Sequence, residues 1–174
     1  MRAVQIEVCT LDELTPEARA VAFANYSDTL DYDQLLADDM QYLLEDTLEE
    51  AGATELYVKP RYSLSYAQGD GASFTGSFKH ADKWVVVVEP NQLGVHYSHW
   101  DSVGVTQCYD SDTETEAPAE VLKEVRELVA STGREIERRG YDMLETAYSD
   151  ESIAEALDGC EFTADGARYY GHED

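Results

Sequence analysis

The sequence predicts an α+β fold with a single, mainly antiparallel sheet of about five or six strands and helices packed mainly on one face. Two observations predict this class. Residues 55–109 consist of short alternating segments bounded by turn residues, as antiparallel strands do. Segments with apolar residues at helical spacing lie before and after that region. We expect 174 residues to form one domain, 1–174, with residues 171–174 as a flexible tail.

The region before residue 55 is expected to form one strand and two helices. Residues 2–9 alternate apolar and polar side chains, which is typical of a half-buried strand. Thr15 and Pro16 supply an N-cap and a first-turn proline, so a helix should begin there. A second helix is expected from Asp31 to a closing Gly52. Its apolar stripe comprises Tyr32, Leu35, Leu36, Met40, Leu43, Leu44 and Leu48.

Residues 62–78, YSLSYAQGDGASFTGSF, predict a β-hairpin because aromatic and small residues alternate on both sides of a Gly-Asp-Gly turn. If the rings pair across the turn, the loop must be odd in length and centred on Asp70. A loop of about three or five residues follows, with Gly69 or Gly71 at positive φ. The expected pairs are Tyr66 with Phe74 and Tyr62 with Phe78, with Leu64 over Gly76.

The remaining elements are predicted from the spacing of apolar residues and from the positions of turn residues. We expect strands over 55–58, 84–88, 93–100 and 103–109, a long helix from 121 that ends near Gly140, a short helix over 149–157 and a small edge strand over 161–163. The apolar run at 84–88 favours a central strand covered on both faces.

The formal net charge of -25, from 37 acidic and 12 basic residues, excludes direct binding of nucleic acid and of anionic membranes at ordinary salt. No basic residue lies between Arg19 and Lys59, and acidic residues crowd that interval. We expect an acidic face on the second helix, which is either an ordinary solvated face or a partner-binding surface. Its residues would be Asp31, Asp33, Asp38, Asp39, Glu45, Asp46, Glu49 and Glu50.

Two explanations of this acidity stay open. Regularly spaced carboxylates can imitate nucleic-acid phosphates and occupy the basic cleft of a nucleic-acid-binding protein. Alternatively, adaptation to high salt favours Asp and Glu over Lys, and screening would make such a surface tolerable.

No catalytic, metal or cofactor site is predicted. Cys9, Cys108 and Cys160 lie far apart without a CxxC pair, so neither a disulfide framework nor a zinc site is expected. His96 and His99 are three residues apart and would point to opposite faces of a strand.

The loop of the hairpin, with Gln68, Gly69, Asp70, Gly71 and Ser73, is either a well-made turn or a polar binding loop on a rigid platform. Together with His80, Asp82 and a later histidine, its polar residues would make an acid–base set. Catalysis by this set is an alternative that the sequence supports weakly.

The segment Gln68–Phe74 with Gly76 resembles a family of small phage and prophage proteins whose shared element reads Ser-Gln-Gly-Asp-Gly-Ala before a small residue, Phe and Gly. The similarity extends to residues 14–18, LTPEA, and 149–162, SDESIAEALDGCEF. Members are often labelled as antitoxins of a toxin-antitoxin stability system. The resemblance implies a mobile-element origin and action in the cytoplasm of a host cell.

We therefore expect a non-catalytic acidic phage protein that inhibits a host protein with a basic surface, such as a nuclease or a nucleic-acid-binding defence complex. One alternative is an antitoxin that neutralises a co-encoded toxin. Another is a small enzyme or ligand-binding module that uses the Gln68–Gly71 loop, with acidity that reflects high-salt adaptation.

Overall fold

The computed structural model describes residues 7–65, 67–91 and 97–170. Its contacts divide the chain into two compact units, Met1–Tyr32 with Met143–Asp174, and Asp33–Asp142. The expectation of one domain over 1–174 stays a prediction. The tail at 171–174, Tyr66, His96 and half of the strand expected at 93–100 lie outside the described residues, and residues 97–100 do not form a strand.

The smaller unit joins the two ends of the chain. In order it contains β1 (Val8–Thr10), η1 (Leu11–Glu13), α1 (Pro16–Ser27), α4 (Asp150–Ala156), β6 (Glu161–Thr163) and β7 (Arg168–Tyr169). The strands form an antiparallel sheet in the order β1-β6-β7. Helix α1 begins as predicted, because the Thr15 hydroxyl accepts a hydrogen bond from the Ala18 N–H at 3.2 Å. The core of this unit comprises Leu11, Ala22, Ile153, Leu157 and Phe162.

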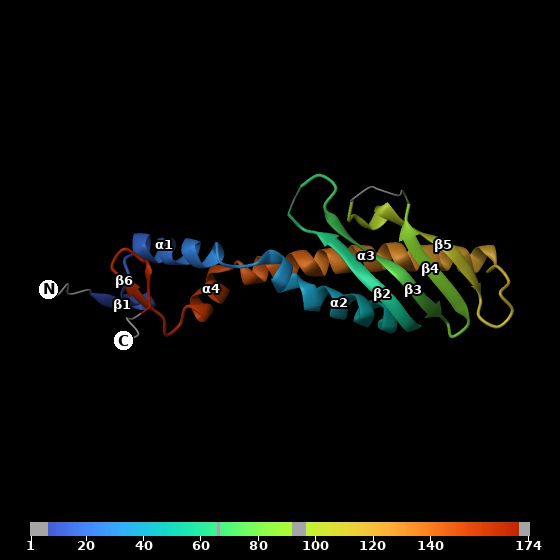
Figure 1. Cartoon of the computed structure of the whole chain (residues 1–174), viewed down its shortest axis with the longest axis horizontal. Coiled ribbons are helices and arrows are strands. Elements are labelled where there is room, and N and C mark those ends of the chain that lie inside the picture. The colour runs from blue at the N-terminus through green and yellow to red at the C-terminus, as the bar shows by residue number, and fades with distance from the viewer. Residues whose placement is uncertain (1–6, 66, 92–96, 171–174) are drawn as a thin grey trace. The chain divides into compact units, whose positions relative to one another are not determined.

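The larger unit is a four-stranded antiparallel sheet with helices on one face (Figure 1). Its elements are α2 (Tyr32–Glu50), β2 (Ala53–Ser63), β3 (Gly71–His80), β4 (Trp84–Pro90), η2 (Trp100–Ser102), β5 (Val103–Asp110) and α3 (Ala119–Ala147). The strand order is β2-β3-β4-β5. The predicted α+β class is confirmed, and the strands of the described chain divide between two sheets of four and three instead of one of five or six.

The core of the larger unit lies between the sheet and the two helices. The predicted stripe of α2 is buried there, with Leu36, Met40, Leu44 and Leu48 at 1% exposure or less. From α3 come Val125, Val129 and Ile136, and from the sheet Phe74, Phe78, Val86 and Val88. Each such side chain contributes about 1.5–3 kcal/mol when fully buried. This burial fixes the rotation of α2, so its acidic residues face outward.

The end of α3 differs from the prediction. The helix was expected to end near Gly140 but continues to Ala147. Gly140 is buried, and a Cβ there would lie 2.6 Å from Leu64 Cδ1 and 3.1 Å from Met40 Sδ. This glycine therefore permits close packing inside the helix and does not terminate it.

The predicted register of the hairpin is wrong. Strand β2 continues through Pro60, which an edge strand tolerates, and Tyr62 pairs with Ala72 instead of Phe78. The loop covers residues 64–70, longer than expected, because the strands pair farther from the turn. The expected positive φ is confirmed at Gly69 (φ 91°) and Gly71 (φ 142°).

Gly76 provides a test of this register. It has φ 127° and lies opposite Val58, and a Cβ there would collide with the backbone carbonyl of Tyr57. Gly76→Ala should lower the free energy of unfolding by about 2–4 kcal/mol, measured by urea denaturation, because strain and overpacking add.

Gly52→Ala is the matched control, since Gly52 has φ 79° and nothing within 4 Å of the added Cβ. It should cost only about 1 kcal/mol, from backbone strain alone. Equal costs for the two variants would contradict the register described here.

Candidate functional site

Helix α2 presents most of the predicted acidic residues to solvent. Asp38, Asp39, Glu49 and Glu50 are exposed, whereas Glu45 and Asp46 are half-buried. Asp31 is exposed just before the helix but belongs to the smaller unit, and the side chain of Asp33 lies outside the described residues. In the larger unit the structure therefore brings six of the predicted residues onto one helix: Asp38, Asp39, Glu45, Asp46, Glu49 and Glu50.

The acidic face contains a large ring that the sequence analysis missed. Tyr42 is 66% exposed. Asp38 and Asp39 precede it by one helical turn, and Glu45 and Asp46 follow it by one turn, so all four are its neighbours on the helix surface. The signal was available, since Tyr42 is a large side chain outside the Leu and Met stripe of α2.

Two carboxylates of this face have partners within the unit, and only one of these partners is charged. Gln41 Nε2 donates to Glu45 Oε1 at 2.6 Å, and Asp46 Oδ2 lies 3.8 Å from Arg139 Nη1. Both members of the Asp46–Arg139 pair are 35% exposed, so the attraction is partly screened. Among the described residues no ion pair involves the four exposed carboxylates, Asp38, Asp39, Glu49 and Glu50.

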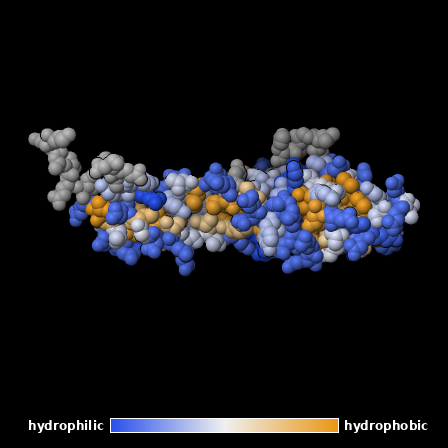
Figure 2. Space-filling view, turned by 60° about the horizontal axis from the view of Figure 1, so that its bottom comes forward, coloured by the Kyte–Doolittle hydropathy of each residue, from blue (hydrophilic) through white to orange (hydrophobic). Residues whose placement is uncertain are grey.

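The visible surface in Figure 2 is mostly hydrophilic, and its hydrophobic residues form separate patches. Among the described residues of the larger unit, the exposed large hydrophobic side chains are Tyr42, Tyr57 and Tyr97. Each is a tyrosine, which offers an apolar ring and a polar hydroxyl to a partner. Tyr42 is the one placed within the acidic face.

Asp70 is a structural residue of the hairpin loop. Its carboxylate accepts hydrogen bonds from the hydroxyls of Ser63 (2.6 Å) and Ser65 (2.7 Å) and from the N–H groups of Ser65 (2.8 Å) and Ala67 (2.7 Å). These donors, led by the Ser63 hydroxyl, lower the pKa of Asp70 to about 2. The Asp70 carboxylate therefore stays charged at ordinary pH and closes the loop. A carboxylate with so low a pKa is unsuitable for proton transfer.

The other loop residues serve different purposes. Ser73 is fully buried on β3, whereas Gln68 is exposed. At Gly71 a Cβ would lie 2.7 Å from Glu137 Oε2 of α3 and 2.9 Å from the Cα of His99. The glycine thus allows three segments of the larger unit to meet at the loop.

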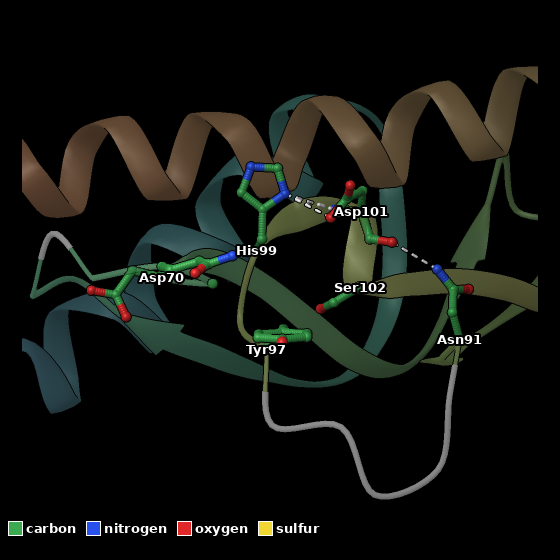
Figure 3. A pocket seen from close by; sticks show the side chains of 8 residues that line it. Asp70, Asn91, Tyr97, His99, Asp101 and Ser102 are labelled. Carbon is green, nitrogen blue, oxygen red and sulfur yellow. Dashed lines mark hydrogen bonds and ion pairs between the residues drawn. The ribbon is translucent and has the colours of Figure 1, made fainter.

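A pocket of about 570 Å³ lies beside this loop (Figure 3). It joins the hairpin loop to the segment around η2, and so brings Gln68 and Asp70 near a later histidine, His99, a grouping that the sequence analysis expected. Its lining residues are Gln68, Gly69, Asp70, Asn91, Tyr97, His99, Asp101 and Ser102. The side chain of Asn91 fixes its far wall, since Nδ2 donates to the carbonyls of Asp101 (2.7 Å) and Val103 (3.1 Å).

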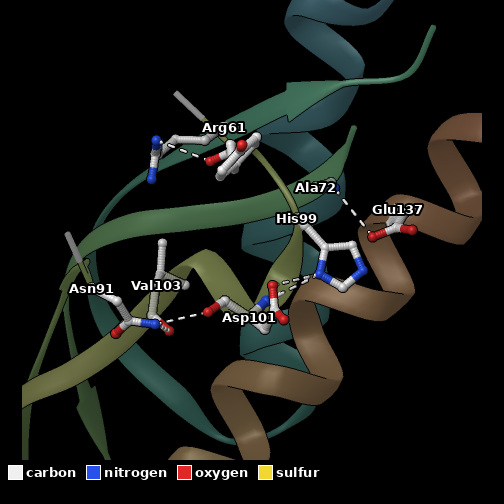
Figure 4. Close-up of polar contacts among 8 residues, drawn as sticks. Arg61, Ala72, Asn91, His99, Asp101, Val103 and Glu137 are labelled. Carbon is white, nitrogen blue, oxygen red and sulfur yellow. Dashed lines mark hydrogen bonds and ion pairs between the residues drawn. The ribbon is translucent and has the colours of Figure 1, made fainter. Parts of the chain in front are cut away.

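His99 and Asp101 form a hydrogen-bonded pair at the pocket, with 2.7 Å between Nδ1 and Oδ1. Figure 4 shows the His99 ring between the carboxylates of Asp101 and Glu137, and the Glu137 carboxylate accepts the Ala72 N–H at 3.3 Å. In Figure 3 the Ser102 hydroxyl points away from the His99 ring. The pair therefore orients the histidine without activating a serine nucleophile.

The predicted acid–base set is assembled only in part, because Gln68, Asp70 and a later histidine, His99, line one pocket, whereas His80 lies elsewhere. His80 is at the opposite end of the ten-residue strand β3 from the loop, which separates it from Asp70 by roughly 30 Å. His80 Nε2 instead lies 3.4 Å from Glu124 Oε1 of α3. Among the described residues no group of three or more His, Cys, Asp or Glu could hold a metal ion.

The comparisons with known proteins give this chain no family. A scan against protein-family models found no match, and searches of curated proteins and of solved structures found none either. The phage-family resemblance at residues 68–76 stays an expectation.

In the described part of the chain no helix is both long and apolar enough to cross a bilayer.

Asp70→Asn tests the role of the loop carboxylate. Because its folded pKa is lowered, Asp70 stabilises the fold above its unfolded pKa, and this contribution is lost as pH falls through about 2. At pH 7 the variant should unfold at a lower urea concentration than wild type. The difference between the two urea midpoints should shrink as the pH falls below about 4.

Asp39→Asn is the control, an exposed aspartate of the same unit. It should leave the urea midpoint almost unchanged at each pH. A difference for Asp70→Asn that does not change with pH, or an NMR titration of Asp70 near 4, would contradict this role.

Proposed function

We propose that this protein is a non-catalytic acidic inhibitor that binds a basic, nucleic-acid-binding host protein through the outward face of α2. The observation that carries the proposal is the exposed ring of Tyr42, which carboxylates surround on the surface of α2. Tyrosines at the centre of interfaces often dominate binding energy, and surrounding charges set partner choice and association rate.

The spacing of the acids supports imitation of a nucleic-acid backbone. The pairs Asp38-Asp39 and Glu45-Asp46 are seven residues apart on α2, about 10 Å at the rise of an α-helix. One DNA strand carries a phosphate about every 3.4 Å along its axis, so the two pairs span about three phosphate steps. A cleft that binds a duplex could therefore accept this helix.

The uneven distribution of charge favours a directed surface over general salt adaptation. The sheet face that the helices leave uncovered carries the exposed Lys59 and carries Lys79, whose Nζ lies 3.1 Å from Glu55 Oε1. This face therefore carries both signs of charge. Helix α2 carries exposed acids and no lysine or arginine, which gives the unit an acidic side that can orient a basic partner.

A charge reversal tests the proposal. Immobilised wild-type protein should capture a specific basic protein from host extract at low salt, and duplex DNA should compete for it. The double variant Asp38→Lys, Asp39→Lys should reduce the captured amount at least tenfold, and Tyr42→Ala should weaken the purified complex by about tenfold or more, measured by calorimetry.

The matched control is Glu114→Lys, Glu120→Lys, which changes the net charge equally at two exposed sites outside α2. It should retain capture within about twofold at physiological salt, because distant exposed charges are screened. Equal losses for both double variants would show that only the net charge matters. No loss for the α2 variant would overturn the proposal.

A further inference from the structure

We propose that the pocket beside the hairpin loop is a receptor for an organic cation, a guanidinium or ammonium group. Its described lining combines an exposed aromatic ring with two aspartates, and it contains neither lysine nor arginine. A cation is attracted to the face of an aromatic ring and to nearby carboxylates.

The ring of Tyr97 is held in place by its neighbours. A Cβ on Gly69 would collide with the Tyr97 ring, so the ring packs directly on the glycine backbone. The Ser98 N–H donates to the Gly69 carbonyl at 3.3 Å, and Arg61 Nη2 donates to the Tyr97 carbonyl at 3.2 Å. Tyr97 nevertheless remains 54% exposed, which leaves ring surface for a ligand.

The aspartates give the pocket a negative electrostatic potential. The Asp101 side chain is 66% exposed, and His99 Nδ1 is bonded to Oδ1, which leaves Oδ2 for a ligand. The Asp70 carboxylate points away from the other lining residues in Figure 3, towards its loop donors, so it adds negative charge nearby but no direct ligand contact. The negative charge and the absence of lysine and arginine from the described lining disfavour a phosphate or carboxylate ligand.

The source of the cation connects the pocket to the proposed function. A basic partner protein would supply an arginine or lysine side chain, and this step alone rests on the proposed inhibitor role. A free small cation is the other source of the same chemistry. The pocket's cation preference itself does not depend on α2.

The test uses ¹⁵N-labelled full-length protein at physiological salt, titrated with N-acetyl-arginine amide and with its neutral isostere N-acetyl-citrulline amide. The arginine compound should shift the amide signals of Gly69, Ser98 and Ser102, and the citrulline compound should bind at least fivefold more weakly. Tyr97→Leu and Asp101→Asn should each weaken arginine binding about three- to tenfold.

Tyr148→Leu, at an exposed tyrosine of the smaller unit, is the control and should bind like wild type. Spectra of Tyr97→Leu and Asp101→Asn that match wild type away from the pocket would show that both variants fold. Equal binding of the two compounds, shifts confined to other residues, or unchanged affinity in both folded variants would overturn the proposal.

Two further arms separate this inference from the inhibitor role. The variant Asp38→Lys, Asp39→Lys should retain binding of the arginine compound even if it no longer captures a partner. If excess arginine compound displaces a captured partner, the partner supplies the cation. If the compound binds at the pocket but displaces no partner, the site is for a free cation.

Discussion

The burial of one stripe of α2 against the sheet and α3 is the constraint on which the larger unit depends. Met40, Leu44 and Leu48 are fully buried, and Gly140 brings α3 close enough to contact Met40. An α-helix with one stripe fixed in a core has no freedom to rotate. The apolar core therefore determines which carboxylates and which ring face outward.

The second constraint is the set of hydrogen bonds that the hairpin loop donates to the Asp70 carboxylate. Four hydrogen bonds to one carboxylate connect Asp70 to Ser63, Ser65 and Ala67, and Gly69 lies against Tyr97. The pocket exists because this loop and the segment around η2 fit each other. The Asp70 carboxylate would be costly to bury in a core. In the loop its charge is stabilised by the hydrogen-bond donors around it.

Local signals in the sequence predicted much of the fold. The Thr15 cap, the end of α2 before Gly52 and the strand that became β5 needed only neighbouring residues. The register of the hairpin and the end of α3 at Ala147 did not, because both depend on contacts between distant segments. Gly140 is an example, since a helix-ending glycine and a close-packing glycine look alike in sequence.

The candidate sites divide in the same way. Acidic residues on one helix could be predicted from composition and period, and six of them do lie on α2 of the larger unit. The exposure of Tyr42 depends on where the core lies. The pocket depends on the approach of residues 68–70 to residues 97–102, which no local pattern reports.

The most direct test of the account is to map the surface that a purified basic partner covers, by cross-linking and NMR line broadening on the full chain. The account predicts that the outward side of residues 38–50 is covered, with signals at 68–70 and 97–102 also affected. A footprint confined to the uncovered face of the sheet, or to residues 7–32 and 143–170, would contradict it.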